Sequence, residues 1–134
     1  MTHRLPVRVY YEDTDLGGFV YYANYLKFIE RGRSEWLREL GIDQVALKGQ
    51  GILFVVRRVL ADYLSPAFYD DQLTVETRLL RMTPVRVVMS QQVMRVDTTL
   101  FRAEVTLACI GPNGRSTPIP APVAAALSEP SDPR

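Results

Sequence analysis

Histidine and cysteine are almost missing from this sequence, which contains one of each among 134 residues. A lone cysteine cannot form a disulfide within the chain, and Cys109 lies in the apolar segment 105–110, which favours a buried small side chain over a reactive thiol. The lone histidine, His3, belongs to an N-terminal leader that we expect to be mobile. A Ser-His-Asp or Cys-His apparatus, or a histidine-based metal site, is therefore very hard to build from one chain.

Long apolar runs and an excess of one charge are also missing. No run approaches the length of a membrane span, and residues 1–6 lack the apolar core of a secretory signal, so we expect a cytoplasmic protein without a membrane segment. The formal net charge is +1 and the basic residues are dispersed, which argues against nucleic-acid binding. With 47% hydrophobic and 23% charged residues, the composition is typical of one globular domain.

What the chain does contain is a strand followed by a long amphipathic helix. Residues 5–11 alternate as a strand, with Val7, Val9 and Tyr11 on one face. Residues 22–40 place apolar side chains at helical spacing, and the glycine that follows is a plausible helix stop. The predicted apolar stripe of this helix consists of Tyr22, Tyr25, Leu26, Ile29, Trp36, Leu37 and Leu40.

Four extended segments follow, over residues 52–64, 73–82, 85–96 and 100–110, separated by turn residues. Because short turns join them, we expect successive antiparallel strands in one sheet, with the helix packed on one face. Prolines exclude a further central strand after residue 117, although residues 123–127 could make one helical turn. The sequence therefore predicts a single α+β domain over residues 1–127 and a disordered tail over residues 128–134.

The most informative segment is 11–25, YEDTDLGGFVYYANY, which runs from the strand through an acidic turn and a glycine pair into the helix. Carboxylates stand here where a helix N-terminus presents free N–H groups, which combines a base or nucleophile with a site for developing negative charge. The structural alternative is that Asp13 or Asp15 caps the helix and that Gly17 and Gly18 only make the turn. Composition alone favours this alternative.

Together with FIERGR at 28–33, this segment resembles the hot-dog-fold acyl-CoA thioesterases, in particular the Tol–Pal-associated branch related to 4-hydroxybenzoyl-CoA thioesterase. The resemblance continues, more weakly, through residues 54–57, 62–63, 65–67 and 69–71. It implies a hot-dog fold, in which a five-stranded antiparallel sheet wraps around one long helix. It also implies a homodimer with sheets joined edge to edge, often paired into a homotetramer, with the active site between subunits.

The resemblance also implies roles for individual residues. Asp15 matches the catalytic aspartate, as nucleophile or general base. Many Tol–Pal-associated members carry histidine where this chain has Tyr22, but the 4-hydroxybenzoyl-CoA enzyme carries tyrosine, so the oxyanion donor implied here is the backbone N–H near Tyr22. Gly17 and Gly18 would let substrate approach the backbone, and Tyr25 would line the acyl pocket, although an aromatic residue at helical spacing is more often part of the core.

Charged residues add candidates for binding. Coenzyme A carries phosphates, and Arg81 and Arg86 flank the turn where the resembled enzymes often contact its nucleotide end. Arg57 and Arg58 are second candidates, and for any single arginine a solvated surface charge is the simpler interpretation. Arg33 falls on the apolar helical stripe, where we expect a structural pair with a neighbouring glutamate, Glu30, which could also orient water.

The leading hypothesis is hydrolysis of an acyl-CoA thioester to a carboxylic acid and coenzyme A, with no metal and no cofactor besides the coenzyme A of the substrate. One alternative is a hot-dog hydratase or dehydratase, but such enzymes usually pair an aspartate with a histidine, and this chain has only His3. Another is a non-catalytic acyl-CoA-binding or scaffold protein attached to envelope machinery or lipid-synthesis proteins. The length and kind of acyl group, and dimer against tetramer, remain open.

Overall fold

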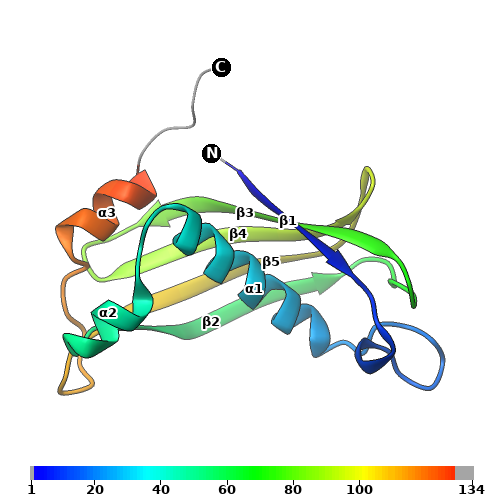
Figure 1. Cartoon of the computed structure of the whole chain (residues 1–134), viewed down its shortest axis with the longest axis horizontal. Coiled ribbons are helices and arrows are strands. Elements are labelled where there is room, and N and C mark those ends of the chain that lie inside the picture. Colours follow the sequence, from blue (N-terminus) through cyan, green and yellow to red (C-terminus); the bar gives the residue numbers. More distant parts are fainter. Residues whose placement is uncertain (1, 129–134) are drawn as a thin grey trace.

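The computed structural model describes residues 2–128 and contains one antiparallel sheet of five strands (Figure 1). The strands are β1 (His3–Arg8), β2 (Leu53–Tyr63), β3 (Gln72–Met82), β4 (Arg86–Arg95) and β5 (Thr98–Ile110). The helices are α1 (Asn24–Glu39), α2 (Gln44–Gly49) and α3 (Ala121–Ser128), and a 3-10 turn, η1, spans Tyr11–Asp13. The expected α+β architecture of five antiparallel strands and one long helix is confirmed, whereas the tail beyond residue 128 lies outside the described residues.

The spatial order of the strands is β1-β3-β4-β5-β2, which separates neighbours in the sequence. β3, β4 and β5 form successive hairpins, as their short turns predict. However, β2 pairs with β5 and β1 pairs with β3, so the expectation that β2 and β3 pair as successive strands is wrong. The connection at 64–71 carries the chain past the start of α1 instead, and β1 and β2 become the two edges of the sheet.

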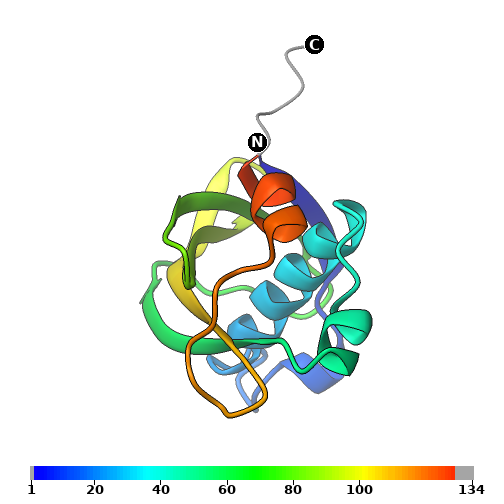
Figure 2. The same cartoon turned by 90° about the vertical axis from the view of Figure 1, so that its left-hand side faces the viewer.

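Helix α1 lies along the concave face of the sheet, which curves around it (Figure 2). It begins at Asn24 rather than Tyr22, because the Asn24 side-chain amide donates to the carbonyl of Asp13 at 2.9 Å and turns this residue inward. Tyr22 therefore precedes the helix and is 62% exposed, and Leu26 is also exposed, so their placement on the buried stripe is wrong. Phe28 is buried in their place.

Gly32 is the point of closest approach between α1 and the sheet. A Cβ atom built on it would lie 2.6 Å from Val75 Cγ1, 3.0 Å from Thr77 Oγ1 and 3.4 Å from Gln91 Nε2. Contacts under 3.0 Å are not tolerated by packed atoms, so a residue without a side chain is required for the helix to lie this close to β3 and β4.

A buried polar network joins α1 to the same part of the sheet. The Gln91 side-chain amide donates to the Ile29 carbonyl at 2.8 Å and to Thr77 Oγ1 at 2.9 Å, and Arg33 Nη1 donates to Gln91 Oε1 at 2.9 Å. Glu30 instead accepts from the Ser34 hydroxyl at 2.7 Å, so the expected Glu30–Arg33 pair is wrong. Burial lowers the pKa of the Arg33 guanidinium, which is held by an uncharged amide.

His3 belongs to β1, contrary to the expected mobile leader. It stands opposite Thr77 in the ladder, its side chain is largely buried, and its Nε2 lies 2.9 Å from a carboxylate oxygen of Glu39. Glu39 ends α1, whereas Asp15 precedes that helix, and a helix of 16 residues is about 24 Å long. His3 is therefore too far from Asp15 to act as its catalytic partner within one chain.

The two short helices, α2 and α3, are longer than the sequence analysis predicted. Asp43 starts α2 by accepting the N–H of Ala46 at 3.0 Å, in a segment for which the sequence analysis predicted no helix. α3 is longer than the single turn expected, and it buries Val123 and Leu127 against the core. No helix among residues 2–128 has the length and apolarity needed to cross a membrane.

Cys109 is fully buried, as expected, and burial raises the pKa of its thiol. We expect iodoacetamide at about pH 8 to alkylate the folded protein at least about tenfold more slowly than the urea-unfolded chain, because both access and the thiolate fraction are reduced. The measurement is mass spectrometry of quenched samples over time. Equal rates in the two states would contradict this placement of Cys109.

Val96 occupies the two-residue turn between β4 and β5 with a φ of 55°, an unfavourable conformation for a β-branched residue. It is 85% exposed, so little packing opposes its replacement. We expect Val96→Asn to raise the free energy of unfolding by about 1 kcal/mol, measured by urea denaturation. Val45→Asn, at an exposed valine in α2 with ordinary helical backbone, is the control and gives no gain.

Candidate active site

The acidic turn folds as a tight hairpin between η1 and α1. Thr14 and Val20 form a bridge, the N–H of Asp15 donates to the Phe19 carbonyl at 2.8 Å, and the N–H of Gly18 donates to the Asp15 carbonyl at 3.1 Å. Gly18 has a φ of 85°, which a glycine adopts without strain. The loop places Asp15 at the surface, just before the start of α1.

The Asp15 carboxylate is held by its own turn. Its Oδ1 accepts the N–H groups of Gly17 at 3.0 Å and Phe19 at 3.2 Å, while Oδ2 makes no hydrogen bond to the part of the chain that the structure describes. Asp15 does not cap α1, whose N-cap position is Ala23 and which has no side-chain cap, so the capping alternative is wrong for Asp15. An oriented carboxylate with one exposed oxygen is suited to nucleophilic or general-base chemistry.

Asp13 has a structural role that the sequence left open. It is buried, its Oδ2 accepts the N–H of Tyr10 at 2.8 Å, and its carbonyl accepts from the Tyr21 N–H and the Asn24 side chain, each at 2.9 Å. These bonds fix η1 against the start of α1, rather than capping α1 with a carboxylate. Asp13 thereby supports the loop that carries Asp15.

Tyr22 lies in the turn immediately before α1. The Tyr21 carbonyl closes this turn by accepting the N–H of Asn24 at 2.8 Å, and the N–H of Tyr22 has no acceptor within residues 2–128. Unpaired N–H groups at the start of a helix carry partial positive charge and bind anions. The backbone here is therefore available to an oxyanion, whereas the Tyr22 ring points into an exposed aromatic cluster with Tyr21 and Tyr63.

Tyr25 lies in the core of the described chain. Its ring stacks on Phe101 at 5.1 Å between centroids, and its hydroxyl accepts the N–H of Ala67 at 3.0 Å. The ring is almost fully buried, and this burial raises the pKa of its hydroxyl. These contacts favour the core role over direct contact with substrate.

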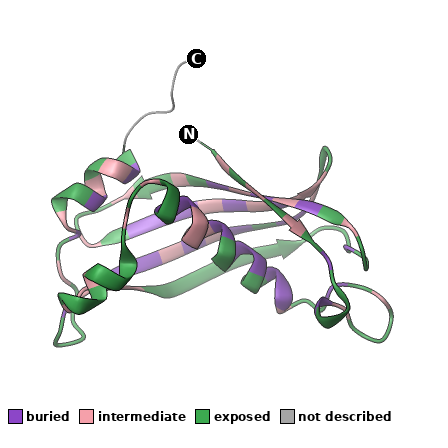
Figure 3. Ribbon diagram, viewed as in Figure 1, coloured by how far each residue is buried: buried purple, intermediate pink, exposed green. Residues whose placement is uncertain are grey.

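Tyr63 is the aromatic residue that reaches the surface beside this core. Its hydroxyl donates to the Tyr22 carbonyl at 3.0 Å, its ring packs edge-on against Tyr25 and Phe101, and it is 48% exposed. The sequence did not single it out, and its only signal was its place at 62–63 in the family resemblance. Strand β2, which ends at Tyr63, is exposed along nearly its whole length although it is rich in valine and leucine (Figure 3).

Arg81 and Arg86 do not approach Asp15 within one chain. β3 starts beside the Asp15 loop, where Phe68 bridges Phe19, and Arg81 lies at its far end. At about 3.3 Å per residue, the strand separates Arg81 from that end by about 30 Å. Figure 1 shows the loop before α1 and the turn between β3 and β4 at opposite ends of the sheet.

The arginine near the Asp15 end of the sheet is Arg95, which sequence reasoning missed. Its Nη1 lies 2.7 Å from Asp71 Oδ2, and its guanidinium stands over the Phe68 ring at 5.8 Å. Nothing in the sequence around Arg95 indicated a place near the site, because its partners, Asp71 and Phe68, are brought to it only by the connection between β2 and β3.

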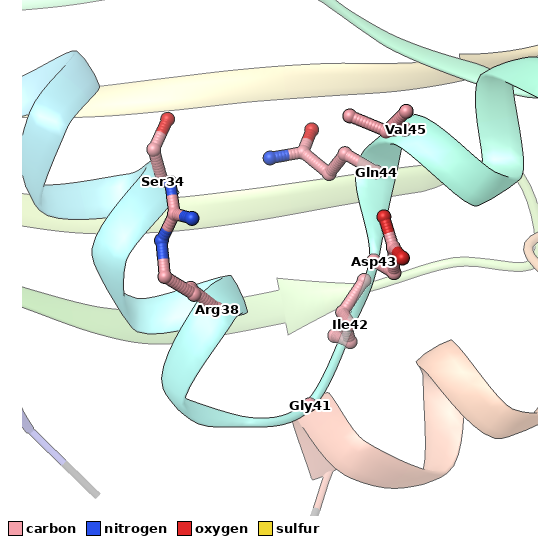
Figure 4. Close-up of a pocket in the computed structure, with 7 residues that line it drawn as sticks. All are labelled: Ser34, Arg38, Gly41, Ile42, Asp43, Gln44 and Val45. Carbon is pink, nitrogen blue, oxygen red and sulfur yellow. The ribbon is translucent and has the colours of Figure 1, made fainter.

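A hollow between the end of α1 and the start of α2 lies away from this chemistry (Figure 4). It is lined by Ser34, Arg38 and residues 41–45, none of which the sequence analysis assigned to a site. Because it adjoins the C-terminal end of α1, the length of that helix separates it from Asp15. The candidate catalytic groups, Asp15 and the N–H of Tyr22, therefore lie at the other end of α1, away from this hollow.

Solved structures define the class of this fold. A probable thioesterase from Bartonella henselae is 38% identical, with a TM-score of 0.85 over 90% of this chain and 100% of that chain. A 1,4-dihydroxy-2-naphthoyl-CoA thioesterase from Synechocystis has a TM-score of 0.92 over 99% of this chain and 100% of that chain, at 23% identity, which supports the fold alone. The architecture is the hot-dog fold of thioesterases, as expected.

The sequence comparisons agree with the fold. The model of the thioesterase superfamily matches residues 17–101, more than half of the chain. The acyl-CoA thioester hydrolase YbgC of Escherichia coli O6:H1 is 44% identical over 110 residues, 81% of this chain and 82% of that protein. The acyl-CoA thioesterase YbgC of Haemophilus influenzae is 45% identical over 106 residues, 78% of each chain. This chain belongs to the thioesterase superfamily; Asp15 itself lies just before the matched segment.

Proposed function

We propose that this enzyme hydrolyses the thioester of an acyl-CoA to a carboxylic acid and free coenzyme A. The observation that carries the proposal is the exposed Asp15 carboxylate, oriented by the N–H groups of Gly17 and Phe19 in the hairpin that precedes α1. The activity named for the YbgC relatives supports the same substrate class.

The proposed chemistry needs no histidine. In one route Asp15 attacks the thioester carbonyl, expelling the coenzyme A thiolate and leaving an anhydride that water hydrolyses. In the other, Asp15 removes a proton from an attacking water, the C–S bond breaks, and the proton passes to the departing coenzyme A thiolate. In both routes the carbonyl oxygen gains negative charge, which the N–H of Tyr22 and the positive end of α1 stabilise. In the nucleophilic route, hydrolysis of the anhydride releases the acid and restores the carboxylate.

We further propose that the working unit is at least a dimer joined through β2. The two edges of the sheet differ, because β1 carries Pro6 between Arg4 and Arg8, which obstruct pairing with another strand. β2 has eleven residues without proline and exposes valine, leucine and tyrosine side chains. A long apolar edge of this kind is stabilised by pairing with a second copy, which would also cover the surface beside Tyr63.

Release of thiol from a panel of acyl-CoA substrates tests the proposed activity. Short aliphatic, long aliphatic and aromatic acyl-CoAs are incubated with the purified protein, and free coenzyme A is measured with a thiol reagent. Hydrolysis of at least one substrate with turnover supports the proposal, and the panel reports the size of the acyl pocket. Saturable binding without thiol release would favour the scaffold alternative, and hydration of an enoyl-CoA without release would favour a hydratase.

A further inference from the structure

Edge strand β2 carries a charge pattern on the face turned away from α1. A bulge between Val56 and Arg58 is followed by a regular ladder with β5. Within it, Arg58, Leu60 and Asp62 occupy alternate positions, so their side chains lie on one face. Leu60 and Asp62 line a shared hollow with Glu104 of β5 on this outer face.

We propose that two copies pair through antiparallel β2 strands with Leu60 on the two-fold axis, so that Arg58 of each copy faces Asp62 of the other. The inference rests on the dimer proposed above and specifies its register. In a two-fold pair, the residue that meets its own copy on the axis fixes every other pairing. Side chains directly opposite one another must lie on the same face of the joined sheet.

The alternative registers are electrostatically worse. With Arg58 on the axis two guanidinium groups face each other, and with Asp62 on the axis two carboxylates do, both of which are destabilising. With Val59 on the axis Arg58 faces the partner's Leu60, and with Ala61 on the axis Asp62 faces the partner's Leu60, so the charges stay unmatched. Only Leu60 on the axis gives two reciprocal pairs of opposite charge and an apolar contact between them.

Both charged groups are available for this role. Arg58 is exposed and forms no ion pair within residues 2–128. Asp62 lies 3.3 Å from Arg102 Nε, but both side chains of that pair are more than half exposed, and such surface pairs contribute little to stability. Asp62 can therefore accept a second guanidinium from the partner.

This register also completes the candidate active site. It sets the partner's Arg57 opposite Tyr63, the residue whose hydroxyl donates to the Tyr22 carbonyl. The bulge leaves Arg57 outside the ladder with β5, so its placement rests on its being next to Arg58 on the paired edge, close to the partner's Tyr63. The partner's Arg57 is thereby a cation for a coenzyme A phosphate at the Asp15 end of the sheet, which Arg81 of the same chain does not reach.

Charge reversal tests the register. Arg58→Asp and Asp62→Arg each place like charges opposite one another twice in the dimer, so each is expected to weaken dimerisation by about tenfold or more, and the double variant is expected to restore it. Dissociation constants come from sedimentation over a dilution series. The control is Arg78→Asp, an exposed arginine of β3 away from the edge, which leaves dimerisation unchanged. Unaffected single variants, a double variant as weak as the singles, or a monomeric wild-type chain would each overturn the register.

Mixed dimers test the contribution of Arg57 across the interface. Asp15→Asn alone is expected to be nearly inactive, and Arg57→Ala alone is expected to raise KM with little change in kcat. The two variant chains are then coexpressed. If Arg57 acts in trans, each mixed dimer has one intact site, which combines Asp15 of one chain with Arg57 of the other. About half of the dimers are mixed, so activity at low substrate concentration recovers to about a quarter of the wild-type value. An unchanged KM in Arg57→Ala, or no recovery in the mixture, would overturn the role of Arg57, while thiol release by the wild-type protein would still support the proposed function.

Discussion

Replacement of Asp15 by asparagine is expected to lower kcat for thioester hydrolysis by about 100-fold or more without unfolding the protein. An amide can neither attack the carbonyl nor accept a proton from water at neutral pH. The amide oxygen of asparagine can still accept the N–H groups of Gly17 and Phe19, so the turn should keep its shape. Initial rates of coenzyme A release measure the loss, and circular dichroism and sedimentation check folding and assembly.

Glu12→Gln is the matched control for Asp15→Asn. Glu12 is an exposed carboxylate in the same acidic segment and is expected to keep near wild-type activity when its charge is removed. Loss of activity in both variants would indicate a general charge effect, and full activity in Asp15→Asn would remove Asp15 from the mechanism.

Replacement of Gly32 by alanine is expected to lower the free energy of unfolding by about 2 kcal/mol or more. The new methyl group would lie 2.6 Å from Val75 Cγ1 and 3.0 Å from Thr77 Oγ1, and both of these side chains are β-branched and stiff. Alanine favours a helix over glycine by about 1 kcal/mol, which is too little to offset this overlap. Urea denaturation with a fixed slope measures the change.

Two further variants separate overlap from helix propensity. Gly49→Ala introduces the same methyl group in α2, where no atom lies within 4 Å, and is expected to be neutral or stabilising. Combining Gly32→Ala with Val75→Ala removes the overlapping Cγ1, so the double variant should lose less stability than the sum of the single variants. Additive losses, or a Gly32→Ala protein as stable as the wild type, would contradict the close packing of α1.

The local sequence pattern predicted most of the helices and strands, but not which strands pair with one another. Alternation over 73–110 is a property of neighbouring residues, so the hairpins of β3, β4 and β5 could be predicted. The pairing of β2 with β5 joins residues far apart in sequence, and no periodicity encodes it. The start of α1 was misplaced because it depends on a tertiary bond from Asn24 to the Asp13 carbonyl.

In the candidate site, too, local motifs could be predicted from the sequence and contacts between distant residues could not. Asp15 was predicted from a contiguous motif, but the choice between capping and an exposed carboxylate needed the hydrogen bonds of the folded turn. Arg33 was recognised as a charge on the apolar stripe of the helix, while its partner Gln91 lies 58 positions away and could not be predicted. Arg95 gave no signal in the sequence and Tyr63 gave only its place in the family resemblance, because their contacts depend on the path of the chain between β2 and β3.

The hydrogen bond from the Tyr63 hydroxyl to the Tyr22 carbonyl joins the outer edge of the sheet to the first peptide of the helix turn. That carbonyl and the N–H of Ala23 belong to one planar peptide unit, so the phenol that holds one also sets the direction of the other. In the dimer proposed above, a shift of β2 would therefore turn the peptide that directly follows Tyr22. The β2 edge proposed as the interface and the turn that carries the proposed oxyanion donor, the N–H of Tyr22, are thus linked by one hydrogen bond.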